Sequence, residues 1–124
     1  MRIYLAGPMR NIPFFNFSNF DAVAYMLRGA GHTVLNPADK DREVYGKDFE
    51  LKFPTGQFSD CPEAKFSLRE ALEYDLSWIC RKADTLYMLT GWEHSGGARA
   101  EHAVAAALNL KIIYEEDYEN NDCT

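Results

Sequence analysis

The sequence predicts an α/β protein built on a doubly wound parallel sheet of four to five strands, with helices on both faces. Short apolar runs alternate along the chain with segments whose apolar residues recur at helical spacing, which is typical of this class. Three of these runs end at a glycine or an asparagine. Because 124 residues with 47% hydrophobic side chains can enclose one core, we expect a single domain over residues 1–124.

The start of the chain predicts two short strands around one helix. The apolar run 3–6 stops at a Gly-Pro pair, as a buried strand before a sharp turn does. Helical periodicity follows over 17–27, with Ser18 and Asp21 as a capping box. A second strand is expected over 33–35.

The rest of the chain predicts one long loop and then a regular alternation of elements. The elements expected, in order, are an irregular loop over 38–66 with at most a short helix in it, a helix over 67–82, a strand over 85–90, a helix over 98–108, a strand over 110–114 and an acidic tail over 115–124. So long an irregular stretch often forms a lid or a binding loop. The tail carries five acidic residues, and we expect it to be solvated.

Right-handed crossovers between these strands predict the order 2-1-3-4, as in Rossmann-like and flavodoxin-like sheets. Such sheets bind ligands beyond the carboxyl ends of their strands. Candidate binding residues at those ends are Gly7, Pro8, Met9, Arg10, Asn36, Ser95, Gly96 and Gly97.

Asp75 interrupts the apolar side of the helix expected over 67–82. On a helical wheel it lies beside Leu72 and Ile79, on the side that faces the sheet. A charged group is seldom buried there without a partner, because its desolvation costs several kcal/mol. Asp75 is therefore either a functional group or the cap of a neighbouring loop.

Glu101 likewise interrupts the apolar side of the helix expected over 98–108. It lies between Leu108 and Ala105 on the wheel, in the first turn, where the helix dipole favours a negative charge. A structural alternative is an ion pair with Arg10 or Arg99. Because both carboxylates flank the same expected strand, the functional interpretation is favoured.

The segment His94-Ser95-Gly96-Gly97 leads from a strand into a helix, an arrangement that can bind an anion. Its glycines let backbone N–H groups approach a ligand, and the helix dipole adds to the attraction. Arg10 is a second candidate anion contact. Neither a Walker A motif nor GxGxxG is present, so a dinucleotide is disfavoured.

Composition excludes several other functions. A formal net charge of −6 disfavours a nucleic-acid polymer or an anionic membrane as partner, and no apolar run is long enough to span a bilayer. Three cysteines without a CxxC predict a reducing, cytoplasmic location. The three histidines are not spaced as metal ligands, so we expect no metal and no cofactor.

Three segments taken together resemble the nucleoside 2-deoxyribosyltransferase-like superfamily. They are IYLAGPMR at the start, DLSWI followed by KAD before a strand, and WEHSGGARAE before an alanine-rich helix. The resemblance covers residues 2–114 apart from the middle loop. It implies an enzyme that cleaves or exchanges the base of a small-molecule nucleotide or nucleoside, and a homo-oligomer. The similarity is greatest to small members such as the 2'-deoxynucleoside 5'-monophosphate N-hydrolases.

The resemblance also implies a role for individual residues. Glu101 would attack C1' of the sugar, Asp75 would act on the departing base or hold the nucleophile, and Tyr4 would hydrogen-bond the glutamate. Residues 7–10 and 95–97 would surround a 5'-phosphate, although Pro8 lacks the hydroxyl and N–H of the serine found there in the superfamily.

The expected function is therefore an N-glycosidase acting through a glutamyl-glycosyl intermediate on a nucleoside 5'-monophosphate or deoxynucleoside. One alternative is a deoxyribosyltransferase, and another is a non-catalytic nucleotide-binding module on the same fold. A third is a phosphoribohydrolase, but HSGGARAE departs from the PGGxGTxxE turn of those enzymes.

Overall fold

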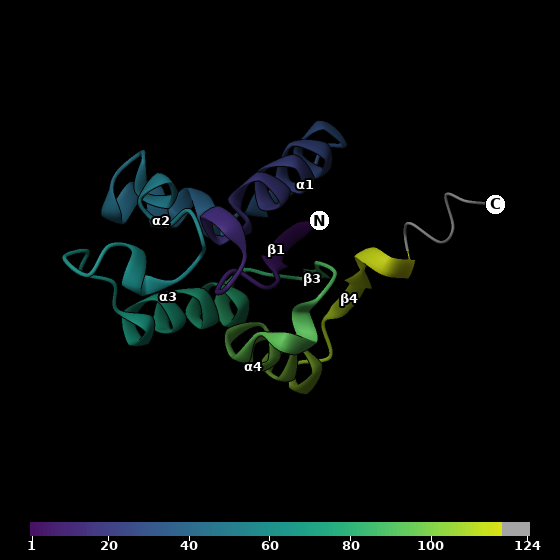
Figure 1. Cartoon of the computed structure of the whole chain (residues 1–124). Coiled ribbons are helices and arrows are strands. Elements are labelled where there is room, and N and C mark those ends of the chain that lie inside the picture. Colours follow the sequence, from purple (N-terminus) through teal and green to yellow (C-terminus); the bar gives the residue numbers. More distant parts are fainter. Residues whose placement is uncertain (118–124) are drawn as a thin grey trace.

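The computed structural model describes residues 1–117 and contains one four-stranded sheet (Figure 1). The strands are β1 (Arg2–Ala6), β2 (Thr33–Leu35), β3 (Thr85–Met88) and β4 (Lys111–Tyr114). They lie in the order β2-β1-β3-β4, and every neighbouring pair is parallel. The predicted α/β class and strand order are confirmed, and the fold is Rossmann-like or flavodoxin-like.

Helices cover both faces of this sheet. They are α1 (Phe17–Gly29), α2 (Pro37–Tyr45), α3 (Leu68–Arg81) and α4 (Gly96–Ala107), with short 3-10 turns η1 (Pro13–Asn16), η2 (Phe49–Lys52), η3 (Phe58–Asp60) and η4 (Trp92–His94). Figure 1 shows α1 on one side of the strands and α3 and α4 on the other. None of the helices within residues 1–117 is long and apolar enough to cross a membrane.

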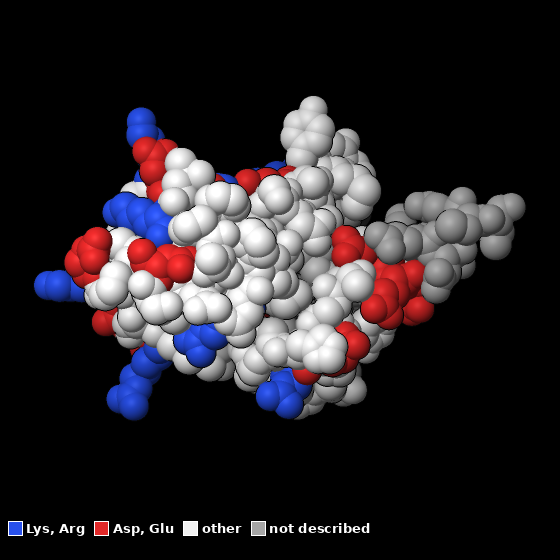
Figure 2. Space-filling view, in the orientation of Figure 1, with Lys and Arg blue, Asp and Glu red and all other residues white. Residues whose placement is uncertain are grey.

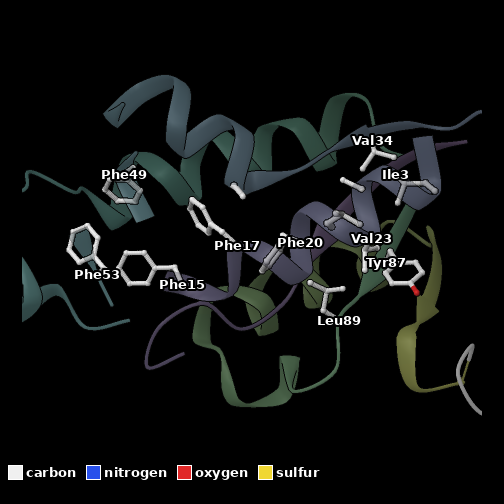
Figure 3. Close-up of a cluster of buried hydrophobic side chains, with 13 residues drawn as sticks. Ile3, Phe15, Phe17, Phe20, Val23, Val34, Phe49, Phe53, Tyr87 and Leu89 are labelled. Atoms are coloured by element: carbon white, nitrogen blue, oxygen red, sulfur yellow. The ribbon is translucent and has the colours of Figure 1, made fainter. Parts of the chain in front are cut away.

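The alternation of side chains along β1 divides the core into two clusters. Ile3 and Leu5 point toward α1, where they join an apolar cluster that Figure 3 shows in close-up. Tyr4 and Ala6 point the opposite way and pack with residues of α3 and α4. Successive residues of a strand face opposite sides, so the position of Tyr4 in β1 directs its hydroxyl toward those two helices.

Aromatic rings extend the α1-side cluster beyond the edge of the sheet. Phe15 lies with its ring centroid 4.6 Å from that of Phe53, and Phe53 lies 5.1 Å from Phe49. Phe58 and Phe66 continue the row at 5.0 Å. These contacts hold the segment that follows α2 against the body of the protein.

The short helix allowed for within the irregular loop over 38–66 is present at its start, as α2. The Asn36 side chain accepts a hydrogen bond from the N–H of Ala38 at 3.0 Å, and Pro37 occupies the first turn. An asparagine N-cap followed by proline is a helix start signal. Because α2 is mostly polar, its apolar periodicity is too weak to reveal the helix.

The expected capping box at the start of α1 is also wrong. Asn16 precedes the helix in a left-handed conformation and makes no side-chain cap. Asp21 instead accepts two hydrogen bonds from Arg42, at 3.0 and 2.8 Å, and one from Asn36 at 3.0 Å. Its carboxylate therefore joins α1 to α2.

The expected acidic tail is partly structural. Glu115 is buried, and its carboxylate accepts a hydrogen bond from the N–H of Thr90 at 3.0 Å. Glu116 and Asp117 are exposed, and acidic side chains gather near this end of the chain in Figure 2. The remaining tail residues, Glu119 and Asp122 among them, lie outside the described residues.

Candidate active site

A cleft of about 680 Å³ opens beyond the carboxyl ends of β1 and β3. This volume is within the usual range for small-molecule sites. The expected site residues that line it are Tyr4, Gly7, Pro8, Met9, Arg10, Asp75, Ser95, Gly96, Gly97 and Glu101. Elements far apart in the sequence thus contribute to one cleft, at the edge where the fold class predicts it.

Glu101 and Tyr4 form the deepest polar contact of the cleft. Glu101 is 6% exposed and Tyr4 is 1% exposed. The Tyr4 hydroxyl donates a short hydrogen bond to Oε2 of Glu101. No ion pair of the described chain involves Glu101, so the alternative pairing with Arg10 or Arg99 is wrong.

Asp75 brings a second carboxyl to the same point. Its Oδ1 is buried and has no hydrogen-bond partner among the described residues. No backbone N–H in residues 1–117 caps its carboxylate, so the loop-cap alternative is wrong. The Tyr4 hydroxyl lowers the pKa of both Asp75 and Glu101, but it has one proton and donates it to Glu101. Asp75 therefore accepts no complete hydrogen bond from Tyr4.

Burial dominates the electrostatics of this group. Desolvation raises the pKa of Glu101 to about 8, with a smaller increase from Asp75, although the Tyr4 hydrogen bond opposes it. Desolvation likewise raises the pKa of Asp75 to about 6, against the influence of Lys40 and Tyr4. Burial, followed by the two carboxylates, raises the pKa of Tyr4. Two neighbouring acids whose pKa values are both raised by burial are typical of functional sites.

The glycine turn at the start of α4 forms one wall of the cleft. Ser95 is the N-cap, and its Oγ accepts a hydrogen bond from the N–H of Ala98 at 3.2 Å. A Cβ built on Gly96 or Gly97 would meet no atom within 4 Å, so open space lies in front of both residues. The first N–H groups of a helix lack partners within it, so this turn can bind an anion.

Residues after β1 form the opposite wall. Gly7 is required by packing, because a Cβ there would lie 2.7 Å from Cβ of Leu89. Arg10 is exposed, and its guanidinium lies over the ring of Phe58 at 4.7 Å. This cation–π contact places a positive charge at the cleft without pairing it to a carboxylate.

Asn36 is the one expected site residue that the structure does not bring to this cleft. Its side chain is buried as the cap of α2 and also donates to Asp21. It lines a separate, charged pocket with residues such as Arg28 and Arg42. The end of β2 therefore contributes a structural cap, and Asn36 lies apart from the other expected site residues.

Asp41, which the sequence did not predict as a site residue, also lines the cleft. Asp41 lies on α2, is 7% exposed and faces the same space as Asp75. It follows the buried Ala38 by three residues, so it shares that face of the helix. The pattern was present in the sequence, but it carries meaning only once α2 is known to be a helix.

The part of the chain that the structure describes contains no group of three histidine, cysteine, aspartate or glutamate side chains placed to bind a metal ion. The polar groups that line the cleft include carboxyl groups, a phenol, one arginine, one histidine and a helix N-terminus.

Comparison with known proteins gives one family. The domain of unknown function DUF4406 matches residues 1–114, which is nearly the whole chain. No curated protein and no solved structure matches this chain. The matched region includes every residue of the cleft, and the chain therefore belongs to the DUF4406 family.

Proposed function

We propose that this protein is an N-glycosidase that cleaves the base–sugar bond of a nucleoside 5'-monophosphate or a deoxynucleoside. The observation that carries the proposal is the meeting of Tyr4, Asp75 and Glu101 at the bottom of one cleft, beside an open helix N-terminus. A buried carboxylate held by a phenol is a suitable nucleophile for a glycosidic carbon.

In this proposal Glu101 attacks C1' of the sugar as the base leaves. The transition state resembles an oxocarbenium ion, and its positive charge stabilises the ionised form of Glu101. Tyr4 orients the attacking carboxylate through its hydrogen bond. Water then attacks C1', breaks the ester bond to Glu101 and releases the sugar.

The glycine turn and Arg10 would hold the 5'-phosphate. Gly96 and Gly97 stand in the first turn of α4, where a side chain on either would meet open space, and Arg10 has no anionic partner in the described chain. Phosphate binding at such a turn uses the helix dipole and the free N–H groups together. The resemblance to the nucleoside 2-deoxyribosyltransferase-like superfamily supports the same roles for the same positions.

The simplest test is to incubate the protein with a panel of nucleosides and 5'-monophosphates and to measure free base by chromatography. We expect base release by the wild type and a loss of about 10⁴-fold or more in Glu101→Gln, which still binds ligand. Near-native turnover by Glu101→Gln would contradict the assignment. A second free base in the mixture distinguishes hydrolysis from deoxyribosyl transfer.

One observation favours a second candidate, a nucleotide-binding module without catalysis. Burial raises the pKa of Glu101 to about 8, so the carboxyl is largely neutral in the free protein at neutral pH. Such a module would bind the same nucleotides, release no base and tolerate Glu101→Gln with unchanged affinity.

The proposed setting is a cytoplasmic homo-oligomer. The thiols of Cys61 and Cys80 are both free, which fits a reducing compartment. Light scattering coupled to size-exclusion chromatography measures the oligomeric state.

A further inference from the structure

Asp41 is a buried carboxyl group that the proposed chemistry does not yet use. It is 7% exposed and forms no ion pair within residues 1–117, and its oxygens keep some contact with the open cleft, because Asp75 Oδ1 is the one fully buried side-chain oxygen of the described residues without a partner. A buried carboxyl without a partner is costly, because folding removes its hydration and returns nothing in exchange. Since the side chain lines the cleft, a ligand there can supply the missing partner.

The surroundings of Asp41 favour its protonated form. Burial raises the pKa of Asp41 to about 7, and Asp75, from the facing helix α3, adds to that increase. Lys40, the neighbour on α2, lowers the pKa in part. Near neutral pH the carboxyl therefore carries a proton for much of the time, as a proton donor requires.

The lining of the cleft combines polar groups with aromatic rings. Glu101 and the glycine turn line it together with the rings of Phe15, Phe20, Phe49, Phe58 and Phe66, and Arg10 lies over the Phe58 ring at 4.7 Å. Asp41 and Pro37 line the same cleft. If the sugar binds at Glu101, as the proposed function requires, a flat base attached to it extends toward the rings, where its faces can stack.

We propose that Asp41 is the acid that protonates the leaving base, and that the substrate therefore carries a base with a ring-nitrogen lone pair, namely cytosine or a purine rather than uracil or thymine. This inference rests on the proposed N-glycosidase function. It assigns Asp41 to the base, and Asp75 and Tyr4 to the nucleophile.

The protons and bonds balance in both steps. In the first, an oxygen of the Glu101 carboxylate bonds to C1', the C1'–N bond breaks with its electron pair passing to the base, and the Asp41 proton moves to a ring nitrogen. In the second, water bonds to C1', Glu101 leaves as a carboxylate, and the proton of the water passes to the Asp41 carboxylate.

The choice of base follows from that proton transfer. Cytosine and the purines each have a ring nitrogen with a lone pair that accepts a proton as the bond breaks. Uracil and thymine have only carbonyl oxygens for this purpose, because their free ring nitrogen already carries hydrogen. General acid catalysis contributes 10²–10⁴-fold, so its absence should be easily measured.

The test compares two leaving groups in Asp41→Asn, with Glu43→Gln as a matched control on an exposed position of α2. On a cytosine or adenine substrate we expect Asp41→Asn to lose about 10²-fold or more in kcat. On a 7-methylguanine substrate, whose base already carries a positive charge and leaves without a proton, we expect a change of less than about 3-fold, because general acid catalysis no longer contributes there. Glu43→Gln should match the wild type on both substrates.

Four outcomes separate this inference from the proposed function. Equal losses on both substrates in Asp41→Asn would overturn the role of Asp41 and indicate a structural one. Release of uracil by the wild type as fast as cytosine, from otherwise identical substrates, would overturn it independently of any variant. If Glu101→Gln loses 7-methylguanine release and Asp41→Asn keeps it, the result supports Glu101 as the nucleophile. A wild type that releases no base at all would overturn the proposed function and this inference together.

Discussion

The two faces of the sheet are built from the same strands but differ in chemistry. On the α1 side, Ile3 and Leu5 pack among aliphatic and aromatic side chains. Figure 3 shows Ile3 in this cluster. On the other side, the adjacent Tyr4 points to two carboxyl groups whose pKa values burial raises. The first face stabilises the fold, whereas the second holds groups that cost stability and can act on a ligand. Four predictions test this division, starting with the largest expected effect.

Phe17→Ala tests the stabilising face. Phe17 is 1% exposed within the α1-side cluster and does not line the cleft. Its truncation should lower the free energy of unfolding by about 3–5 kcal/mol, because the lost contacts leave a cavity. Urea denaturation measures this loss. A loss below about 1 kcal/mol would mean that this face is less closely packed than a core of this kind should be.

Glu101→Gln tests the cost of the other face. A buried carboxyl whose folded pKa is about 8 binds a proton that the unfolded chain releases near its ordinary pKa of about 4.3. Wild-type stability should therefore fall as pH rises from about 4.3 to 8, and Glu101→Gln should remove that contribution. We expect a gain on the order of 2–4 kcal/mol at pH 8 and little change at pH 4.5. Equal unfolding curves for both proteins at pH 8 would contradict this prediction.

Tyr4→Phe removes one hydroxyl from the same face and leaves the ring in place. The Tyr4 hydrogen bond lowers the pKa of Glu101, so without it that pKa should rise further. The proposed activity requires ionised Glu101, so the acidic limb of the pH–rate profile should move to higher pH. We expect turnover to fall about 10–100-fold at pH 7, less than the roughly 10²–10³-fold lost when a donor that binds the transition state directly is removed. A pH–rate profile identical in shape to that of the wild type would argue against coupling of the two groups.

Two glycines of the cleft should respond in opposite ways to alanine. Gly97→Ala enters open space at the start of α4 and should leave stability unchanged or raise it by up to about 1 kcal/mol. Gly7→Ala brings a methyl group against Leu89 and should cost about 1–3 kcal/mol. If the turn binds phosphate, Gly97→Ala should weaken nucleotide binding about 10-fold, which calorimetry measures. Unchanged affinity would leave the turn with no role in binding.

The regular elements were predictable because their signals are local. Apolar runs identified all four strands, and the helical wheel placed Asp75 and Glu101 on faces directed at the core. The role of Tyr4 came from a resemblance alone, because a tyrosine in a buried strand has no distinguishing pattern. The short helix allowed for within 38–66 could not be placed because the residues of α2 are mostly polar, and Asp41 was not recognised for the same reason.

The sequence by itself determined the order of the elements and the face on which each side chain lies, since both depend on the periodicity of neighbouring residues. The tertiary structure decided which faces meet. It brings Tyr4 to Glu101 across 97 residues, ties Glu115 to the end of β3, and keeps Asn36 away from the cleft that Asp41 enters. Such contacts depend on how distant elements pack, and no local pattern of polarity records the distance between two helices.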